Sequence, residues 1–261
     1  MKIIISPAKK MNIDTDTASW RTLPVYLSQT RMLMEYMKSL DYGQCKVIWK
    51  CSDKLARQNY RRFQEMDLER MQTPAIFSYE GIQYQYMAPK VMEDAALAYL
   101  QKHLRILSGF YGILKPFDGV VPYRLEMQAR LGGKNLDSLY EYWGELLAEA
   151  LFQEDSLILN LASKEYSRCI SQYVGKRKDV RFLTCVFGEW ANGKIVEKGT
   201  LAKMARGEMV RYLAEKQAED LDIVKGFGGL NYHFQEAYSD KNTLVFLKNE
   251  SGKNQGESYD K

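Results

Sequence analysis

The sequence contains few of the residues that build disulfide frameworks and metal centres. Only four cysteines and two histidines occur among its 261 residues. No Cys-x-x-Cys motif is present, and no cysteine lies near His103 or His233 in the sequence. Two isolated histidines exclude a histidine-based metal site and disfavour a Ser-His-Asp triad. We therefore expect reduced thiols, no metal and no other cofactor.

Long apolar runs are missing as well. No stretch approaches the roughly 18 apolar residues of a membrane helix, and the first apolar run ends at Ile5, too early for a signal peptide. We expect a cytoplasmic protein with no membrane partner. Neither GxGxxG after a strand nor GxxxxGK[ST] occurs, so no motif indicates a dinucleotide or P-loop nucleotide site.

The composition is that of an ordinary folded protein, with 46% hydrophobic and 27% charged residues. Residues 1–247 contain no repeat and no linker, so they are expected to form one domain. Residues 248–261 (KNESGKNQGESYDK) hold one aromatic and no aliphatic residue, which predicts a disordered tail.

Strand and helix patterns intermix along the chain. Helices are predicted over residues 25–40, 53–66, 92–103, 136–152 and 200–217, and strands over 2–6, 157–160, 179–190, 194–197, 230–234 and 243–247. Asn192-Gly193 predicts a hairpin turn, and residues 75–79 and 82–86 predict a second hairpin around Glu80-Gly81. Without a steady strand–helix–strand rhythm, the expected fold is a mixed α+β domain, not a doubly wound sheet.

The charge is unevenly distributed. The net charge is +4, from 37 basic and 33 acidic residues, but residues 161–211 alone contain eleven Lys and Arg against five Asp and Glu. This block suggests a patch for a phosphate-rich partner. The alternative is a solvated helix face together with the exposed basic turn at residues 175–178.

A glycine-containing segment, residues 104–127 (LRILSGFYGILKPFDGVVPYRLEM), is the first candidate phosphate site. If Ser108, Gly109 and Gly112 form a tight turn between two helices, their backbone N–H groups can face a phosphate, with Arg105 and Lys115 adding charge. Two glycines at a strand end and a turn explain the segment equally well. Arg124 could likewise bind phosphate or pair with Glu126.

Two further segments suggest anion binding. A buried strand ends at Asn160 and a helix begins near Ser163, which places free N–H groups at a helix N-terminus, although Ser163 could serve only as an N-cap. On the helix from Thr200, Lys203, Arg206 and Arg211 share one arc opposite an apolar face. A solvated helix face is the alternative.

Together these segments resemble the YaaA family of bacterial peroxide-stress proteins. The motifs, in order, are Ser6-Pro7-Ala8-Lys9, Ser52-Asp53-Lys54-Leu55-Ala56, LSGFYGILKPFD with PYRLEM, NLAS-x-EY at 160–166, Ala205-Arg206-Gly207-x-Met209, and Gly226-Phe227 before Tyr232. They cover nearly the whole chain up to about residue 247.

The resemblance implies a cytoplasmic protein that limits damage from hydrogen peroxide by lowering unincorporated iron. It also implies a single compact α+β domain with a positively charged cleft, which binds double-stranded or bent DNA through a helix-hairpin-helix-like element around residues 108–115. The residues at matching motif positions are Lys9, Lys54, Arg124, Asn160, Ser163, Lys203 and Arg206. The iron effect is expected to be indirect, because no ligand cluster suited to storing iron is visible.

Two other functions remain open at this point. An enzyme acting on a nucleotide or nucleic-acid phosphate could use Tyr123, Glu126 or Glu165 for acid–base chemistry. A redox sensor could use Cys45 and Cys51, since the neighbouring Lys46 and Lys50 could lower a thiol pKa. The oligomeric state is not determined by these patterns.

Overall fold

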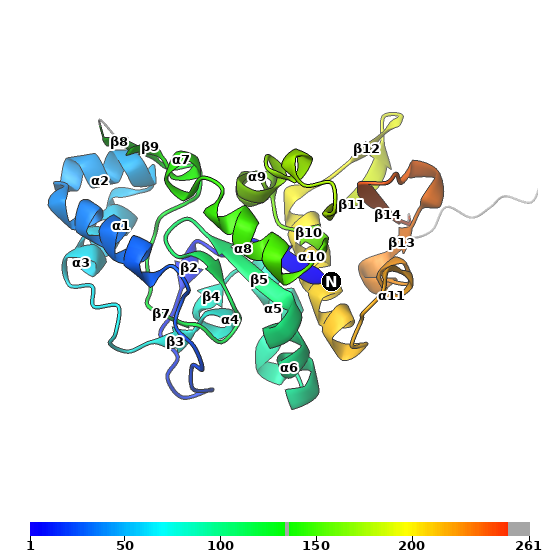
Figure 1. The fold of residues 1–261 in the computed structure, drawn as a ribbon, viewed down its shortest axis with the longest axis horizontal. Coiled ribbons are helices and arrows are strands. Elements are labelled where there is room, and N and C mark those ends of the chain that lie inside the picture. The colour runs from blue at the N-terminus through cyan, green and yellow to red at the C-terminus, as the bar shows by residue number, and fades with distance from the viewer. Residues whose placement is uncertain (134–135, 250–261) are drawn as a thin grey trace, which may run out of the picture.

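A central sheet of eight strands organises the fold of the computed structural model, which describes residues 1–133 and 136–249 (Figure 1). The strands, in spatial order, are β13 (Tyr232–Phe234), β14 (Thr243–Lys248), β11 (Arg181–Ala191), β10 (Leu157–Leu161), β1 (Lys2–Ile5), β5 (Leu104–Ser108) and β6 (Gly112–Leu114), with β12 (Lys194–Val196) paired to β11. The predicted mixed α+β domain is confirmed.

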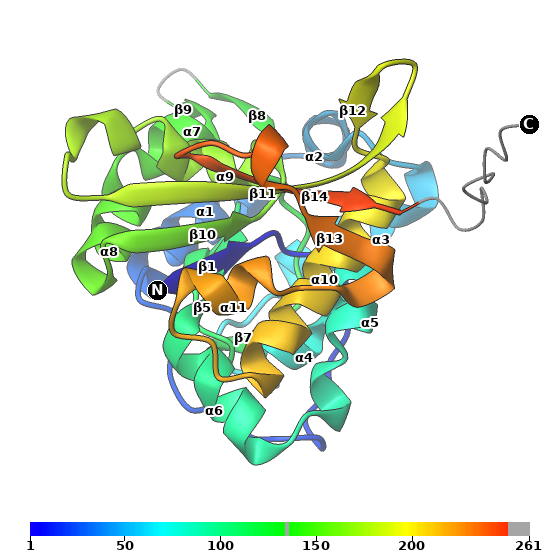
Figure 2. The same ribbon diagram turned by 90° about the vertical axis from the view of Figure 1, so that its right-hand side faces the viewer.

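The five middle strands, from β14 to β5, are all parallel to one another. The antiparallel pairs lie at the margins, where β13 pairs with β14, β6 with β5 and β12 with β11. Figure 2 shows β11, β10 and β1 side by side, with α10 (Gly199–Glu215) and α11 (Leu221–Lys225) in front of them. This parallel core was not predicted, because a long excursion separates β1 from β5 and hides the strand–helix–strand rhythm.

Strand β1 lies in the core of the sheet. Ile3, Ile4 and Ile5 are fully buried. Because successive side chains of a strand point to opposite faces, both faces of the sheet are covered at this position, as is usual in parallel sheets. Burial of three isoleucines stabilises the strand by about 5–9 kcal/mol before entropy is counted.

The remaining helices are distributed around this sheet. They are α1 (Leu27–Ser39), α2 (Tyr42–Trp49), α3 (Asp53–Gln64), α4 (Ala75–Ser78), α5 (Ile82–Met87), α6 (Asp94–His103), α7 (Leu139–Trp143), α8 (Leu146–Glu154) and α9 (Lys164–Ser171). Helices α1–α3 are grouped at one end of the molecule (Figure 1). Three two-stranded pairs complete the fold: β2 (Lys10–Met11) with β4 (Tyr79–Glu80), β3 (Thr73–Pro74) with β7 (Gly119–Val120), and β8 (Arg130–Gly133) with β9 (Leu136–Ser138).

Most of the predicted helices and strands are present, with ends shifted by a few residues. The Asn192-Gly193 turn is confirmed, with φ of 53° and 74° at its two residues, as a tight hairpin turn requires. The disorder predicted for residues 248–261 falls mainly on residues outside the described part. Lys248 itself belongs to β14, and the Asn249 N–H donates to the Asn231 carbonyl at 3.0 Å.

Two local predictions are wrong. The hairpin expected around Gly81 is instead α4, the short strand β4 and α5. Strand β4 pairs with the distant β2, and Tyr84 and Met87 are buried at helical spacing. The single helix expected over 136–152 is β9, α7 and α8, because Gly144 adopts a positive φ of 48° and ends α7.

The prediction of a helix-hairpin-helix-like element around residues 108–115 is also wrong. Its segment forms the antiparallel strands β5 and β6, in which Ser108 is paired with Gly112. Gly112 has a φ of +77°, a conformation that favours glycine, so this residue serves the strand-to-strand turn. Local sequence allowed both a helical and a strand reading of these apolar residues, and pairing of β5 with β1 selected the strand.

No helix within residues 1–133 and 136–249 combines the length and the apolar composition that a membrane span demands.

Close packing of α10 on α5 depends on Gly207. A Cβ at this position would overlap the backbone of Gln83, so only glycine allows this approach. We predict that Gly207→Ala lowers the free energy of unfolding by about 1–3 kcal/mol, as overpacking does, measured by urea unfolding.

Gly199→Ala is the matched control, because Gly199 belongs to the same helix and a Cβ added there would have no other atom within 4 Å. Its stability should be unchanged or slightly raised, since alanine is the better helix former. Equal stability of Gly207→Ala and the native chain would contradict the observed α5–α10 contact.

Candidate functional site

A pocket of about 390 Å³ opens where β1 and β10 end. From β1 the sheet continues to β5 on one side, and from β10 to β11 on the other. Such a reversal between neighbouring parallel strands leaves a crevice outside their carboxyl ends, a frequent ligand position in sheets of this kind. The residues that line this pocket, here called the Lys9 pocket, include Ser6, Lys9, Lys10, Gln83, Tyr84, Ser163, Glu165, Lys203 and Arg206.

The turn from β10 into α9 is held by buried polar contacts. The Asn160 amide donates to Thr184 Oγ1 at 3.2 Å and accepts the Ala162 N–H at 2.9 Å. Ser6 Oγ accepts the Ser163 N–H at 2.9 Å. Asn160 is 3% exposed, so it positions the turn and does not itself face the pocket. The first turn of α9, with its positive dipole end, therefore lines the Lys9 pocket.

Three cations predicted from distant segments meet at this pocket. Lys9 Nζ lies 2.8 Å from Glu126 Oε2, and an Arg206 guanidinium nitrogen lies 3.3 Å from Glu197 Oε1. Lys203 is exposed and, among the described residues, has no carboxylate within ion-pair distance. One of the three cations is therefore fully available, and the other two are shared with acids.

Two carboxylates lie beside Lys9. Glu126 pairs with Lys9 and also accepts from Arg124 at 3.0 Å. Glu165 lines the Lys9 pocket and accepts the Gln128 N–H at 3.3 Å. Burial raises the pKa of Glu165 above its ordinary value, and the negative charge of Glu126 adds to this rise. The pocket thus combines cations with one carboxyl group that holds its proton unusually well.

Tyr123, the third candidate for acid–base chemistry, differs from the carboxylates Glu126 and Glu165. It is 5% exposed, and its hydroxyl lies 2.6 Å from Ser108 Oγ and 2.9 Å from the Tyr79 hydroxyl. Burial raises the pKa of Tyr123 to about 12. The hydroxyl therefore serves an internal hydrogen-bond chain and is poorly suited to acid–base chemistry on a ligand.

The glycine turn after β5 is also internal. Ser108 Oγ accepts the N–H groups of Phe110 at 3.2 Å and Tyr111 at 2.9 Å, so the hydroxyl group of the predicted phosphate turn is engaged inside the protein. A Cβ at Gly109 would lie 2.5 Å from the Leu125 carbonyl oxygen, and Gly112 is buried against Trp143. These glycines are needed for packing and lie outside the Lys9 pocket.

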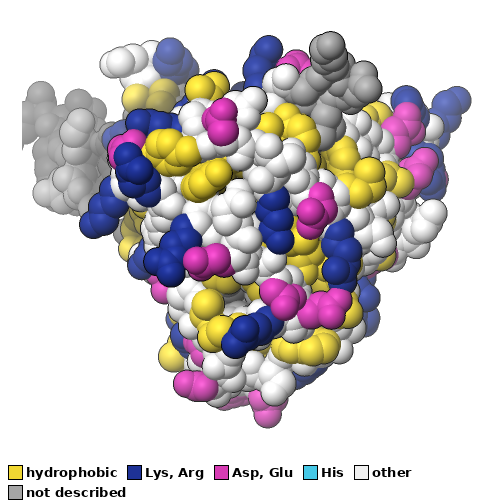
Figure 3. Space-filling view, turned by 90° about the vertical axis from the view of Figure 1, so that its left-hand side faces the viewer, with side chains coloured by type: hydrophobic (Ala, Val, Ile, Leu, Met, Phe, Trp, Pro, Cys, Tyr) yellow, Lys and Arg dark blue, Asp and Glu magenta, His cyan; other side chains and the backbone are white. Residues whose placement is uncertain are grey.

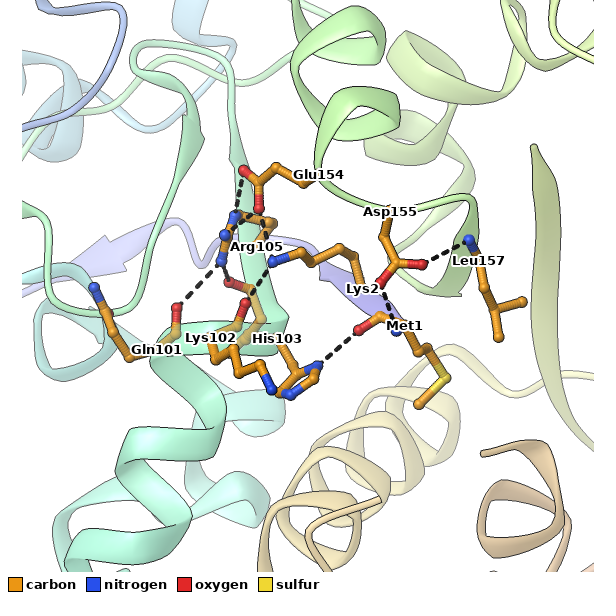
Figure 4. A network of polar contacts seen from close by, with 10 residues as sticks. Met1, Lys2, Gln101, Lys102, His103, Arg105, Glu154, Asp155 and Leu157 are labelled. Carbon is orange, nitrogen blue, oxygen red and sulfur yellow. Dashed lines mark hydrogen bonds and ion pairs between the residues drawn. The ribbon is translucent and has the colours of Figure 1, made fainter. Parts of the chain in front are cut away.

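Arg105 lies at the opposite, amino-terminal edge of the parallel strands (Figure 4). Its Nε donates to Glu154 at 3.0 Å, and Glu154 also pairs with Lys2 at 2.9 Å. The N-terminal amine pairs with Asp155 at 2.6 Å in the same network. Lys115 is exposed on the side of Arg105, near Asp118. Neither predicted cation joins the Lys9 pocket.

Lys54 and Arg124 were predicted at the same site, with different outcomes. Lys54 is exposed in the first turn of α3 and does not line the Lys9 pocket. Helix α3 is at the end of the molecule that faces the viewer in Figure 3, where positive and negative side chains alternate without an extended area of one sign. Arg124 forms the ion pair with Glu126 that the sequence left as its alternative.

Several lining residues were not predicted as site residues. Ser6 and Lys10 are part of, or next to, the motif around Lys9, so the signal was present in the sequence. Tyr84 donates its hydroxyl hydrogen to the Ser6 carbonyl at 3.0 Å, and Gln83 lies beside it. These two were missed because the segment was assigned to a hairpin, and only α5 turns them toward the pocket.

Within the described part of the chain, no group of three or more His, Cys, Asp or Glu side chains is arranged to hold a metal ion.

The environment of Cys45 contradicts a low thiol pKa. All four cysteines are free, and Cys45 is fully buried. Burial, helped by the charge of Asp41, raises the pKa of Cys45 to about 11. The expected effect of Lys46 and Lys50 is thus outweighed by desolvation.

We predict that Cys45 stays reduced when the folded protein meets peroxide near pH 7.5, because only about one thiol in 3,000 is ionised at this pKa. Mass spectrometry after alkylation measures the modification, and the urea-unfolded chain, in which Cys45 should react, is the control. A Cys45–Cys51 disulfide in the folded protein would contradict this assignment.

The fold and site define a class: α+β proteins with a partly basic pocket at the carboxyl ends of two neighbouring parallel strands. A family model described as peroxide stress protein YaaA matches residues 1–238. The chain is 53% identical over 248 residues to a UPF0246 protein of Desulfitobacterium hafniense (strain Y51), which covers 95% of this chain and 98% of the relative.

Two other relatives are equally similar. A UPF0246 protein of Lachnoclostridium phytofermentans is 54% identical over 251 residues, with 96% of this chain and 98% of the relative covered. One of Pediococcus pentosaceus is 51% identical over 250 residues, with 96% and 99% covered. The chain belongs to the YaaA family of peroxide stress proteins, as its motifs predicted. Its family therefore concerns the response to hydrogen peroxide, an oxidative stress.

Proposed function

We propose that the Lys9 pocket binds the phosphate backbone of double-stranded or bent DNA, largely independently of base sequence, and that the protein acts in the cytoplasm. By occupying DNA, the protein helps limit damage from hydrogen peroxide and unincorporated iron. The family supports the stress-response part of this proposal, and the four free thiols accord with a reducing compartment.

The observation that carries the DNA part is the convergence of Lys9, Lys203 and Arg206 on one concavity. These cations come from the loop after β1 and from α10, which are far apart in the sequence. Lys203 supplies a free charge, and the N-terminus of α9 adds backbone N–H groups beside Ser163. Phosphate contacts of this type bind without reading bases.

The acids of the pocket are compatible with phosphate binding. The Lys9 side chain is 63% exposed and that of its partner Glu126 is 17% exposed, and ion pairs open to solvent contribute only about 0–1 kcal/mol. A phosphate oxygen can therefore replace Glu126 as the partner of Lys9 at small cost. Arg206, whose side chain is 13% exposed, is held more firmly by Glu197 and can keep that partner while it contacts a phosphate.

We predict that Lys203→Ala weakens binding to every duplex tested and lowers the slope of log affinity against log salt by about 1, because one phosphate contact is lost. Fluorescence anisotropy with labelled duplexes between about 50 and 200 mM salt measures both.

Arg211→Ala is the matched control. Arg211 belongs to the same helix and its loss changes the net charge equally, but it pairs with Glu215 at 2.7 Å and does not line the Lys9 pocket. Its affinity should stay near the native value. Equal losses in the two variants would show that net charge, and not the pocket, governs DNA binding.

A second function, an enzyme acting on a nucleotide or nucleic-acid phosphate, is favoured by one observation. Glu165, with its raised pKa, lies in the same pocket as the cations. A carboxyl group with a raised pKa beside a phosphate site can act as a general acid or base. Turnover of nucleotides, abasic DNA or branched DNA that disappears in Glu165→Gln would favour this function over simple binding.

For DNA binding, Glu165 predicts a pH dependence. Because its pKa is raised, Glu165 takes up its proton at a higher pH than an ordinary glutamate. Its negative charge opposes phosphate above that pH and disappears below it, so affinity should rise as pH falls, by about two- to fivefold, the size of one partly exposed charge interaction.

Glu165→Gln should bind DNA at neutral pH as tightly as the native chain does at lower pH, with a flatter profile. Anisotropy titrations from about pH 5 to 8 measure both affinities. Other groups are protonated equally in the two proteins, so the difference between their pH profiles reports on Glu165. If the affinity of the two proteins for DNA changed with pH in the same way, Glu165 would not influence the phosphate site.

A further inference from the structure

A second and larger pocket lies apart from the Lys9 pocket. Its volume is about 540 Å³, and it shares no lining residue with the Lys9 pocket. The residues that surround it are Asn12, Ile13, Arg62, Glu65, Met66, Asp67, Arg70, Met71, Val121 and Pro122. We call it the Arg62 pocket. Its size falls within the range of about 300–1,000 Å³ that is usual for small-molecule sites.

Arg62 is the unusual residue of this pocket. It is half-buried, and its side-chain hydrogen bond is a long one, of 3.4 Å, to Asn59 Oδ1. Among the described residues, no carboxylate lies within ion-pair distance of Arg62. Burial lowers the pKa of Arg62, and no neighbouring acid opposes this shift. A partly buried guanidinium without a counter-ion is costly in a folded protein, which points to a missing anionic partner.

The two acids that also line this pocket are engaged elsewhere. Glu65 pairs with Arg61 at 2.9 Å, on the exposed side of α3. Asp67 accepts the Glu69 N–H at 2.9 Å. Arg70, a second cation of the pocket, is exposed and likewise has no carboxylate within ion-pair distance in the described part. Two guanidinium groups are therefore available to one ligand.

The rim and walls of the pocket add two observations. Met71 has a φ of 54°, a left-handed conformation that is strained for a residue with a side chain and tends to occur at ligand sites. Ile13 and Met71 are 49% and 56% exposed, so the apolar wall, which Val121 and Pro122 continue, is open to solvent. An apolar wall next to two arginines suits a ligand with an anionic end and a flat apolar body.

We propose that the Arg62 pocket binds a nucleoside monophosphate. Its phosphate pairs with Arg62 and Arg70, because guanidinium groups match phosphate oxygens with two parallel hydrogen bonds. Its base lies against Met71, Val121 and Pro122. This site is separate from the proposed DNA site, and it does not depend on whether the Lys9 pocket binds DNA.

Isothermal titration calorimetry with adenosine, guanosine, cytidine and uridine monophosphates tests the proposal on the full-length chain. At least one of them should bind with one-to-one stoichiometry, and adenosine and inorganic phosphate, which each carry half of the ligand, should bind more weakly. Arg62→Gln should reduce the affinity about tenfold or more, the loss of one charged hydrogen-bond pair.

Arg57→Gln is the matched control, because Arg57 belongs to the same helix, pairs with Asp53 and, like Asp53, does not line the pocket. It should bind the nucleotide as the native chain does, and so should Lys203→Ala, which alters only the Lys9 pocket. If Arg62→Gln fails to fold, Arg70→Gln, at an exposed position, provides the same test. The proposal is overturned if no nucleotide binds, if both arginine variants bind like the native chain, or if Lys203→Ala abolishes binding.

Discussion

The parallel pairing of β1 with β10 is the interaction on which the rest of this structure depends. Ile4 is paired with Asn160 and Ile5 with Leu161, although more than 150 positions separate the two strands. Parallel strands bring their carboxyl ends to the same edge, so the loop that carries Lys9 and the turn that carries Ser163 must meet there. Ile3, Ile4 and Ile5 keep β1 inside the core, because both faces of the sheet are covered at this position.

The two edges of the parallel strands use their charges differently. At the amino-terminal edge, Arg105, Lys2 and the chain's own amine are paired with Glu154 and Asp155, and this network joins β1, β5 and β10 (Figure 4). At the carboxyl edge, Lys203 is unpaired within the described residues and Lys9 has an exposed pair. A fully paired edge contributes to the fold, whereas a partly paired edge can exchange its partners for a ligand.

Glycine and aromatic residues around β5 show why a motif can mislead. Ser108-Gly109-Phe110-Tyr111-Gly112 contains the elements of a phosphate loop, but Phe110 and Tyr111 are buried and Ser108 Oγ takes their N–H groups. Local sequence does not reveal whether an N–H group faces solvent or the interior. The same limit applies to Glu126 and Glu165, which are close only because the segment at 124–128 passes beside the start of α9.

The sequence by itself determined the family, the α+β class, the buried strands predicted at 2–6 and 157–160, the helices that carry Lys54 and Lys203, and the hairpin at Asn192-Gly193. Each of these depends on short-range patterns: apolar periodicity, a capping position or a turn that needs positive φ. Only the tertiary structure decided which cations share a pocket, that Arg105 and the glycine turn are structural, and that Arg62 lacks an acid partner within the described chain. Those outcomes depend on strand order and burial, which arise from contacts between residues far apart in the chain and leave no local periodicity to read.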